Sequence, residues 1–200
     1  MKIDSIMRSA PVIPVLVLEE EMDWFALAET FVGAGLPVLE VTLRTPIALE
    51  AIRQMGKVDG AIVGAGTVLN DRQLGEAVDA GSRFIVSPGL TDALGKAVIR
   101  AGVAYLPGVA NAGDIMRGLD LGLDRFKFFP AESSGGIPAL KALSGPFANI
   151  RFCPTGGIRP ETAGDWLVLD PVLCVGGSWF VKRGDPLDSI GERARAASAL

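Results

Sequence analysis

The sequence contains no histidine, and this absence removes several common kinds of active site. A zinc or iron centre held by imidazole cannot form, and neither can a Ser-His or Cys-His nucleophile pair. Acid–base chemistry must therefore use Asp, Glu, Lys, Tyr or water. Because the chain has one tyrosine and six lysines, few candidates remain beyond the carboxylates.

Cysteines and long apolar segments are scarce as well. Cys153 and Cys174 both lie in apolar segments, which favours reduced thiols in the cytoplasm over a disulfide framework. No apolar run approaches the ~20 residues of a membrane span, and the N-terminal MKIDSIMRSA lacks the core of a signal peptide. With a net charge of −4 and no run rich in Lys or Arg, we expect neither a membrane nor a nucleic acid as a partner.

What the chain does have is enough apolar material for one core. Its 200 residues are 49% hydrophobic, which suits one domain covering 1–200. A chain of this length buries roughly 70% of the surface that its unfolded form exposes, so neither a disulfide nor a metal is needed for stability. No linker or low-complexity segment divides it.

Eight short apolar segments recur along the chain. Each is almost continuously apolar, as is typical of strands covered on both faces. The eight predicted strands are 12–18, 36–43, 61–68, 83–89, 103–109, 125–131, 150–157 and 172–179.

The intervening segments have helical patterns. Residues 21–35 are predicted to form a helix that ends at Gly33 and Gly35, and 46–55 a helix with Pro46 in its first turn. The apolar side of the first helix comprises Trp24, Phe25, Leu27, Ala28, Phe31 and Val32. The predicted starts of later helices are Asp71, Thr91 or Asp92, and Asn111 as N-caps, and Pro160 as a first residue.

Eight strand-then-helix units predict an α/β protein with a parallel sheet. The alternative, an open doubly wound sheet, has fewer strands and a glycine-rich turn after the first. Here LEEEMD (18–23) follows the first strand and contains no glycine. We therefore predict a compact (β/α)8 TIM barrel, preceded by a short helix from about Ile3 to Arg8.

Charged side chains fall at unusual places in two of these strands. Strand alternation places Glu40 and Arg44 on the inward side of the second strand, and Lys127 and Phe129 on the inward side of the sixth. A charge inside a barrel is costly unless it is paired or used, so Lys127 is either a structural ion-pair partner of Glu40 or a functional amine. We expect the other five lysines to be solvated: Lys2, Lys57, Lys96, Lys141 and Lys182.

Glycines gather where the predicted strands end. In a barrel this end carries the active site, and the loops after the seventh and eighth strands often bind phosphate. Glycine lets backbone amides approach an anion, and the hydroxyl of Ser178 could add a donor. The alternative is tight turns that need positive φ. The glycines are Gly64, Gly66, Gly89, Gly108, Gly156, Gly157, Gly176 and Gly177.

Six motifs run in order between Pro11 and Phe180. They are EVTLRT (40–45), IVGAGTVLN (62–70), VSPGL (86–90), FKFFPAE (126–132), FCPTGGI (152–158) and VGGSWF (175–180). Together these motifs resemble those of the 2-keto-3-deoxy-6-phosphogluconate (KDPG) aldolases, class I enzymes of the Entner–Doudoroff pathway. Bifunctional members of this family also cleave 4-hydroxy-2-oxoglutarate (KHG).

The resemblance implies a role for each matching residue. Lys127 would form the Schiff base, Glu40 would transfer protons and Arg44 would bind the substrate carboxylate. Thr67, Pro88 and Phe129 would line the pocket. The phosphate end of the substrate would meet Thr155, Gly156, Gly157, Gly176, Gly177 and Ser178.

The resemblance also implies a cytoplasmic homotrimer that acts on a phosphorylated keto acid and needs no cofactor or metal. Alternatives remain at this level. One is an aldolase for the C4 epimer, 2-keto-3-deoxy-6-phosphogalactonate, with the same barrel and lysine chemistry. Another is a phosphate-binding barrel without turnover, and a phosphosugar isomerase would need a carboxylate base but no inward lysine.

Overall fold

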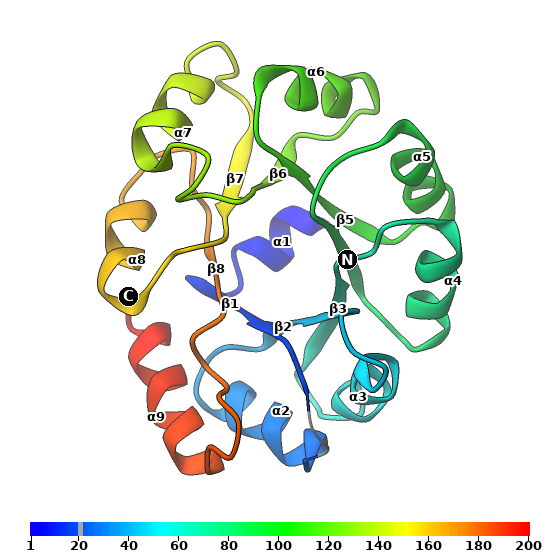
Figure 1. Cartoon of the computed structure of the whole chain (residues 1–200), viewed down its shortest axis with the longest axis vertical. Coiled ribbons are helices and arrows are strands. Elements are labelled where there is room, and N and C mark those ends of the chain that lie inside the picture. Colours follow the sequence, from blue (N-terminus) through cyan, green and yellow to red (C-terminus); the bar gives the residue numbers. More distant parts are fainter. Residues whose placement is uncertain (20–21) are drawn as a thin grey trace.

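The computed structural model of the protein describes residues 1–19 and 22–200. Within these residues, parallel strands form a ring, and every helix except the short first one lies outside that ring (Figure 1). The strands are β1 (Val12–Leu16), β2 (Val38–Thr42), β3 (Ile62–Gly66), β4 (Phe84–Ser87), β5 (Ala104–Val109), β6 (Arg125–Phe128), β7 (Arg151–Pro154) and β8 (Val175–Gly177).

The strands pair in the order β7-β6-β5-β4-β3-β2-β1-β8, and every pairing is parallel. Two parallel bridges, Phe152 with Val172 and Thr155 with Gly176, join the outer edges and bring the sheet round to a nearly closed barrel. Each observed strand lies inside a predicted one, so the predicted (β/α)8 architecture is confirmed.

The helices alternate with the strands. They are α1 (Ile3–Met7), α2 (Trp24–Gly33), α3 (Ala48–Met55), α4 (Asp71–Asp79), α5 (Asp92–Ala101), α6 (Ala112–Asp120), α7 (Gly136–Ser144), α8 (Pro160–Leu167) and α9 (Leu187–Ser198). The predicted N-terminal helix is confirmed as α1, and Thr91, Asn111 and Pro160 begin their helices as predicted.

The first long helix differs from its prediction at its start. Residue 21, where the helix was predicted to begin, lies outside the described residues, and α2 begins at Trp24. Asp23 caps it, because its Oδ1 accepts a hydrogen bond of 2.9 Å from the N–H of Ala26. The prediction that Phe25 packs inward is wrong, since 40% of this residue is exposed on the solvent side.

Two other helix starts were predicted wrongly. Pro46 precedes α3, which begins at Ala48, so the proline does not occupy the first turn. Asn70 caps α4 in place of Asp71, since its side-chain oxygen accepts a 3.0 Å hydrogen bond from the N–H of Gln73. Both errors shift a boundary by one or two residues, and neither alters the fold.

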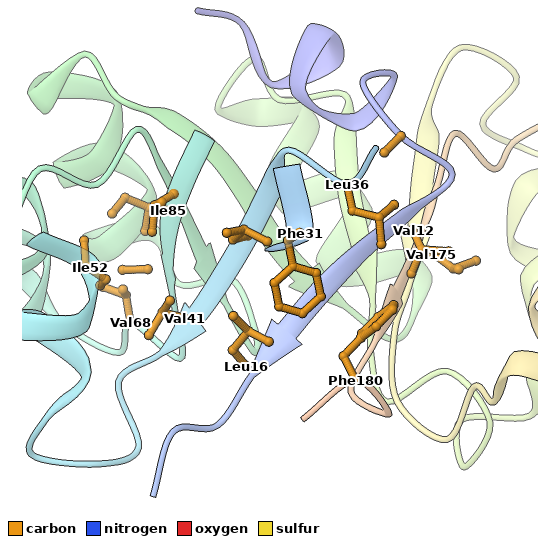
Figure 2. Close-up of a cluster of buried hydrophobic side chains, with 14 of the residues drawn as sticks. Val12, Leu16, Phe31, Leu36, Val41, Ile52, Val68, Ile85, Val175 and Phe180 are labelled. Carbon is orange, nitrogen blue, oxygen red and sulfur yellow. The ribbon is translucent and has the colours of Figure 1, made fainter. Parts of the chain in front are cut away.

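The larger of two apolar cores lies between the strands and the surrounding helices (Figure 2). Phe31 from α2 and Phe180 from the β8–α9 loop meet edge to face, with ring centroids 5.5 Å apart. Leu39 and Val41 of β2 belong to this core, as strand alternation predicts for outward positions.

The smaller core fills one end of the barrel interior. It contains inward side chains such as Val38 and Phe84, and Ile6 and Met7 of α1 are completely buried against them. In Figure 1, α1 lies across the middle of the ring. This helix therefore closes the barrel at one end.

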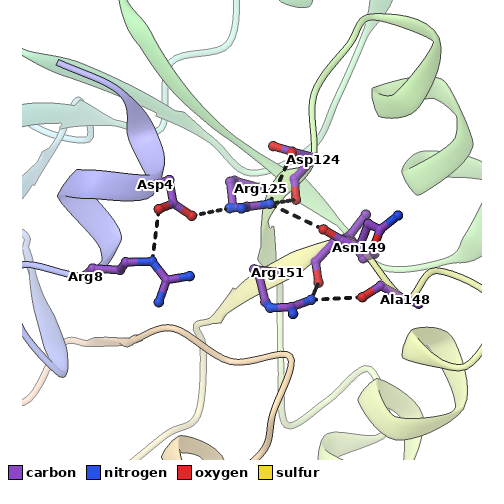
Figure 3. Close-up of polar contacts among 8 residues, drawn as sticks. Asp4, Arg8, Asp124, Arg125, Ala148, Asn149 and Arg151 are labelled. Carbon is purple, nitrogen blue, oxygen red and sulfur yellow. Dashed lines mark hydrogen bonds and ion pairs between the residues drawn. The ribbon is translucent and has the colours of Figure 1, made fainter.

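An ion-pair network fixes α1 in that position (Figure 3). Arg125, the first residue of β6, donates to Asp4 with an Nε–Oδ1 distance of 2.6 Å, and Arg8 donates to the other oxygen at 2.9 Å. Hydrogen bonds from Arg125 and then Arg8 lower the pKa of Asp4. Because Arg125 begins its strand, α1 covers the amino-terminal end of the barrel and leaves the carboxyl-terminal end for a ligand.

No helix in the described ranges is long and apolar enough to cross a membrane.

Candidate active site

Lys127 and Glu40 meet inside the barrel, as the strand alternation predicts. The Nζ atom of Lys127 lies 3.0 Å from Oε1 and 3.4 Å from Oε2 of Glu40. Lys127 is 5% exposed and Glu40 is 3% exposed. Since β2 and β6 are not neighbours in the sheet, the pair spans the interior of the barrel. A buried pair of this kind adds little stability compared with apolar side chains, so a functional use is the better explanation for its presence.

The surroundings of Lys127 are aromatic on one side. Its Nζ lies 5.2 Å from the ring centroid of Phe129, within the range of a cation–π contact. Phe126 and Phe128 face outward into the larger core, as predicted. The other five lysines are all exposed, as predicted, which leaves Lys127 as the one buried lysine among the residues that the structure describes.

Gly66 makes room for the carboxylate of Glu40. A Cβ at this position would lie 2.7 Å from Cγ and 2.8 Å from Cδ of Glu40, and closer still to Oε1. Such separations are far below van der Waals contact. The sequence prediction gave Gly66 only a general role at a strand end. The residues around Gly66 do not reveal that Glu40 of the neighbouring strand packs against it.

Arg44 lies at the mouth of the barrel and not inside it. The prediction placed its side chain inward at the C-terminal end of the second strand; Arg44 does lie at that end, but β2 stops at Thr42 and Arg44 is exposed two residues later. Its Nε donates a hydrogen bond of 3.2 Å to Oγ1 of Thr67, which follows β3 and has a left-handed backbone with φ of 58°. The guanidinium also carries two terminal nitrogens that suit bidentate binding of a carboxylate.

Pro88 lies in a turn that a buried tyrosine supports. The hydroxyl of Ser87 donates to the carbonyl of Gly89 at 2.6 Å, so the hydroxyl of Tyr105 must be the donor in its 2.7 Å bond to Ser87. Burial raises the pKa of Tyr105 to about 12, although the bond to Ser87 opposes the shift. A Cβ at Gly108 would collide with the backbone of Pro88, so this glycine lets the turn approach β5.

The loop after β7 has the turn geometry that the glycine pattern predicts. Gly156 and Gly157 have φ of 102° and 82°, a region in which other residues are strained. Thr155 is buried beside them, and a Cβ on Gly156 would lie 3.3 Å from the Phe129 ring. This turn therefore borders the aromatic wall next to Lys127.

Gly176 and Gly177 differ from that pair because they belong to β8 and do not have positive φ. A Cβ on Gly176 would lie 2.8 Å from Cγ2 of Thr155, and one on Gly177 would lie 2.8 Å from Cε3 of Trp179. Close packing, and not turn geometry, explains glycine at these two positions. Ser178 follows directly and is exposed.

Both cysteines are free thiols buried in the smaller core. The neighbouring thiol of Cys153, together with burial, raises the pKa of Cys174. In the part of the chain that the structure describes, no group of three or more Cys, Asp or Glu side chains could hold a metal ion.

The sequence prediction assigned no role to Glu132 or Trp166, which are hydrogen-bonded to each other near the loop after β7. Glu132 ends the FKFFPAE motif, and its Oε1 accepts a 3.1 Å hydrogen bond from Nε1 of Trp166 on α8. The motif contained Glu132, but a bond across 34 residues to a helical tryptophan leaves no pattern in either local segment.

The arrangement as a whole combines a sheltered amine, one carboxylate in contact with it, an arginine at the mouth and a glycine turn. An amine in contact with a proton acceptor can attack a carbonyl carbon and form a Schiff base. The carboxylate can then move protons on the bound substrate.

Comparison with known proteins agrees with this chemistry. The family model for KDPG and KHG aldolases matches residues 3–191. The KHG/KDPG aldolase of Escherichia coli is 48% identical over 200 residues, which cover 97% of this chain and 93% of that protein.

Two solved structures are similar over nearly the whole chain. The 2-keto-3-deoxy-6-phosphogluconate aldolase of Zymomonas mobilis, crystallised with 3-phosphoglycerate, matches with a TM-score of 0.96 and 59% identity, covering 98% of this chain and 95% of that one. The KDPG aldolase of Legionella pneumophila, with pyruvate captured as a covalent carbinolamine, matches with a TM-score of 0.95 and 42% identity, covering 99% and 98%. The chain therefore belongs to the KDPG and KHG aldolase family.

Proposed function

We propose that this protein is a class I aldolase that cleaves KDPG to pyruvate and D-glyceraldehyde 3-phosphate. The observation that carries the proposal is the buried contact of 3.0 Å between Lys127 Nζ and Glu40 Oε1. An isomerase of phosphosugars would need the carboxylate but would gain nothing from this lysine. The carbinolamine in the Legionella relative supports covalent chemistry in the family.

The first step is attack of the Lys127 amine on the C2 ketone. Lys127 must lose its proton before it can attack, and Glu40 Oε1 is the acceptor in contact with it. Glu40 then gives that proton to the hydroxyl of the carbinolamine, which leaves as water, and the nitrogen lone pair forms the C=N bond of an iminium ion; Glu40 is again a carboxylate. The positively charged nitrogen can then accept the electron pair released when a carbon–carbon bond breaks.

Glu40 would carry the proton in the next steps. Its carboxylate, directly or through a water, takes the proton of the C4 hydroxyl, the C3–C4 bond breaks, and D-glyceraldehyde 3-phosphate leaves. The electrons of that bond form an enamine of pyruvate on Lys127. The protonated Glu40 then returns a proton to C3, and water releases pyruvate and the free amine.

The two ends of the substrate would be held by different parts of the barrel mouth. Arg44, oriented by its bond to Thr67, would bind the carboxylate in a bidentate manner. Phe129 and Pro88 would line the space between the ends. The phosphate would meet backbone amides of the turn at Gly156 and Gly157, together with Thr155, Gly176, Gly177 and Ser178.

We further propose that the enzyme cleaves KHG to pyruvate and glyoxylate, since this substrate has the same keto acid end. The E. coli relative, which is named for both substrates, supports this extension. We also infer a cytoplasmic homotrimer from the family resemblance. Light scattering on the purified protein tests the trimer, and a monomeric mass would contradict it.

The direct test is pyruvate release from KDPG, measured beside KHG and the galacto epimer. We expect KDPG to have the highest kcat/KM, because the similarity to the Zymomonas enzyme favours the gluconate configuration. A preference for the galacto epimer would assign the alternative substrate. No turnover of any of the three would leave a phosphate-binding barrel as the better description.

A further inference from the structure

The turn assigned to the phosphate is packed against Glu132. The backbone N–H of Glu132 donates a 3.0 Å hydrogen bond to the carbonyl of Gly156. A Cβ on Gly157 would lie 2.7 Å from both Cβ and Cγ of Glu132, so the stem of this side chain fills the space directly behind the turn. Glu132 therefore contacts both glycines.

The carboxylate of Glu132 is anchored in turn by α8. Trp166 donates from Nε1 to Glu132 Oε1 at 3.1 Å, and its side chain is almost completely buried, with 1% exposure. The Trp166 ring also packs against Phe128 of β6, with centroids 6.3 Å apart. The helix α8 begins at Pro160, just after the turn, and carries Trp166. The turn is therefore connected to Glu132 twice, directly and through α8 and Trp166.

We propose that Glu132 and Trp166 form a brace that positions the turn at Gly156 and Gly157 for the phosphate group of the substrate. This inference rests on the proposed function, which assigns the phosphate to that turn. Backbone amides bind an anion well only when they are held in fixed directions, and two adjacent glycines cannot supply that rigidity themselves. Neither Glu132 nor Trp166 is proposed to touch the reacting atoms, so both are positioning residues.

Trp166→Phe tests the brace because it keeps an aromatic ring and removes the N–H donor. Isothermal titration calorimetry with glycerol 3-phosphate and with pyruvate probes the two ends of the site separately. We expect the Kd of glycerol 3-phosphate to rise about fivefold, equivalent to about 1 kcal/mol, while the Kd of pyruvate stays within twofold. The expected rise in Kd is small because Glu132 is exposed, and water weakens the contribution of an exposed hydrogen bond.

Two further variants separate the hydrogen bond from general effects. Glu132→Gln keeps an oxygen that can accept from Trp166, so its Kd values should remain within twofold of wild type. Trp24→Phe is the matched control, because the buried Nε1 of Trp24 has no hydrogen-bond partner among the described residues. It should leave both Kd values unchanged.

Equal weakening of both ligands by Trp166→Phe would overturn the brace, and so would a lower Tm with unchanged Kd values. Binding does not require turnover, so the two proposals fail separately. A wild-type protein that binds glycerol 3-phosphate but cleaves no keto acid would refute the aldolase and leave the brace standing. A wild-type aldolase whose Trp166→Phe variant binds both ligands normally would refute the brace alone.

Discussion

Gly66→Ala is the perturbation that most specifically tests the position of Glu40. The backbone of Gly66 does not have positive φ, so alanine fits the chain conformation. The added Cβ would lie 2.7 Å from Cγ and 2.8 Å from Cδ of Glu40, against an ordinary carbon–carbon contact of about 3.5 Å or more. The Glu40 side chain must therefore move by roughly 1 Å, and Oε1 is the atom that holds Lys127.

The displacement predicts the size of the kinetic effect. A misplacement of about 1 Å in a catalytic group can cost roughly a hundredfold in rate. We therefore expect kcat for KDPG cleavage to fall about a hundredfold, or about 2.7 kcal/mol in activation free energy. A Schiff base with pyruvate should still form, because Lys127 is unchanged, although more slowly, because the displaced Glu40 is the acceptor of its proton. Exchange of the pyruvate methyl protons with deuterated water should slow with kcat.

Steady-state kinetics and proton exchange followed by NMR measure these two quantities. Gly75→Ala is the matched control, since a Cβ at this position in α4 meets nothing within 4 Å. It should leave kcat unchanged. If Gly66→Ala folded normally and retained kcat within threefold of wild type, the reaction would not depend on the position of the Glu40 carboxylate.

Three other predictions concern the tyrosine, the amino-terminal network and metals. The near-ultraviolet absorbance of phenolate should show that Tyr105 ionises with a pKa of about 12 in the folded protein. Ionisation with the ordinary pKa of about 10 would contradict its burial. Asp4→Asn should lower Tm at neutral pH, and because the folded pKa of Asp4 is lowered, the difference from wild type should vanish as the pH falls through that value; a difference that persists in acid would refute the network. Dialysis against EDTA should leave kcat unchanged, whereas a loss that added metal restores would indicate a metal-dependent mechanism.

Features with a regular period were predictable from the sequence. Continuous apolar segments identified the strands, because both faces of a barrel strand are covered. Alternation then placed Glu40 and Lys127 on the inner side, and the structure brings them into contact. The inward position is a direct consequence of the two-residue strand period, so no knowledge of the other strands was needed.

Features that depend on strand ends or distant contacts were not predictable. The Arg44 side chain was predicted to point inward at the end of the second strand, because the alternation was extended past Thr42, where the strand has already ended. The Gly176–Gly177 pair resembled the true turn at 156–157 in sequence, although it lies in a strand. Glu132 and Trp166 were missed because only the folded chain brings their segments together.

The central claim is that one sheltered amine forms a covalent bond with the substrate ketone, and reductive trapping tests it most directly. The protein is incubated with pyruvate and borohydride, digested, and analysed by peptide mass spectrometry. The account predicts a single modified lysine, Lys127, and no modification in Lys127→Ala. A label on any of the five exposed lysines instead, or an unlabelled wild-type protein, would contradict it.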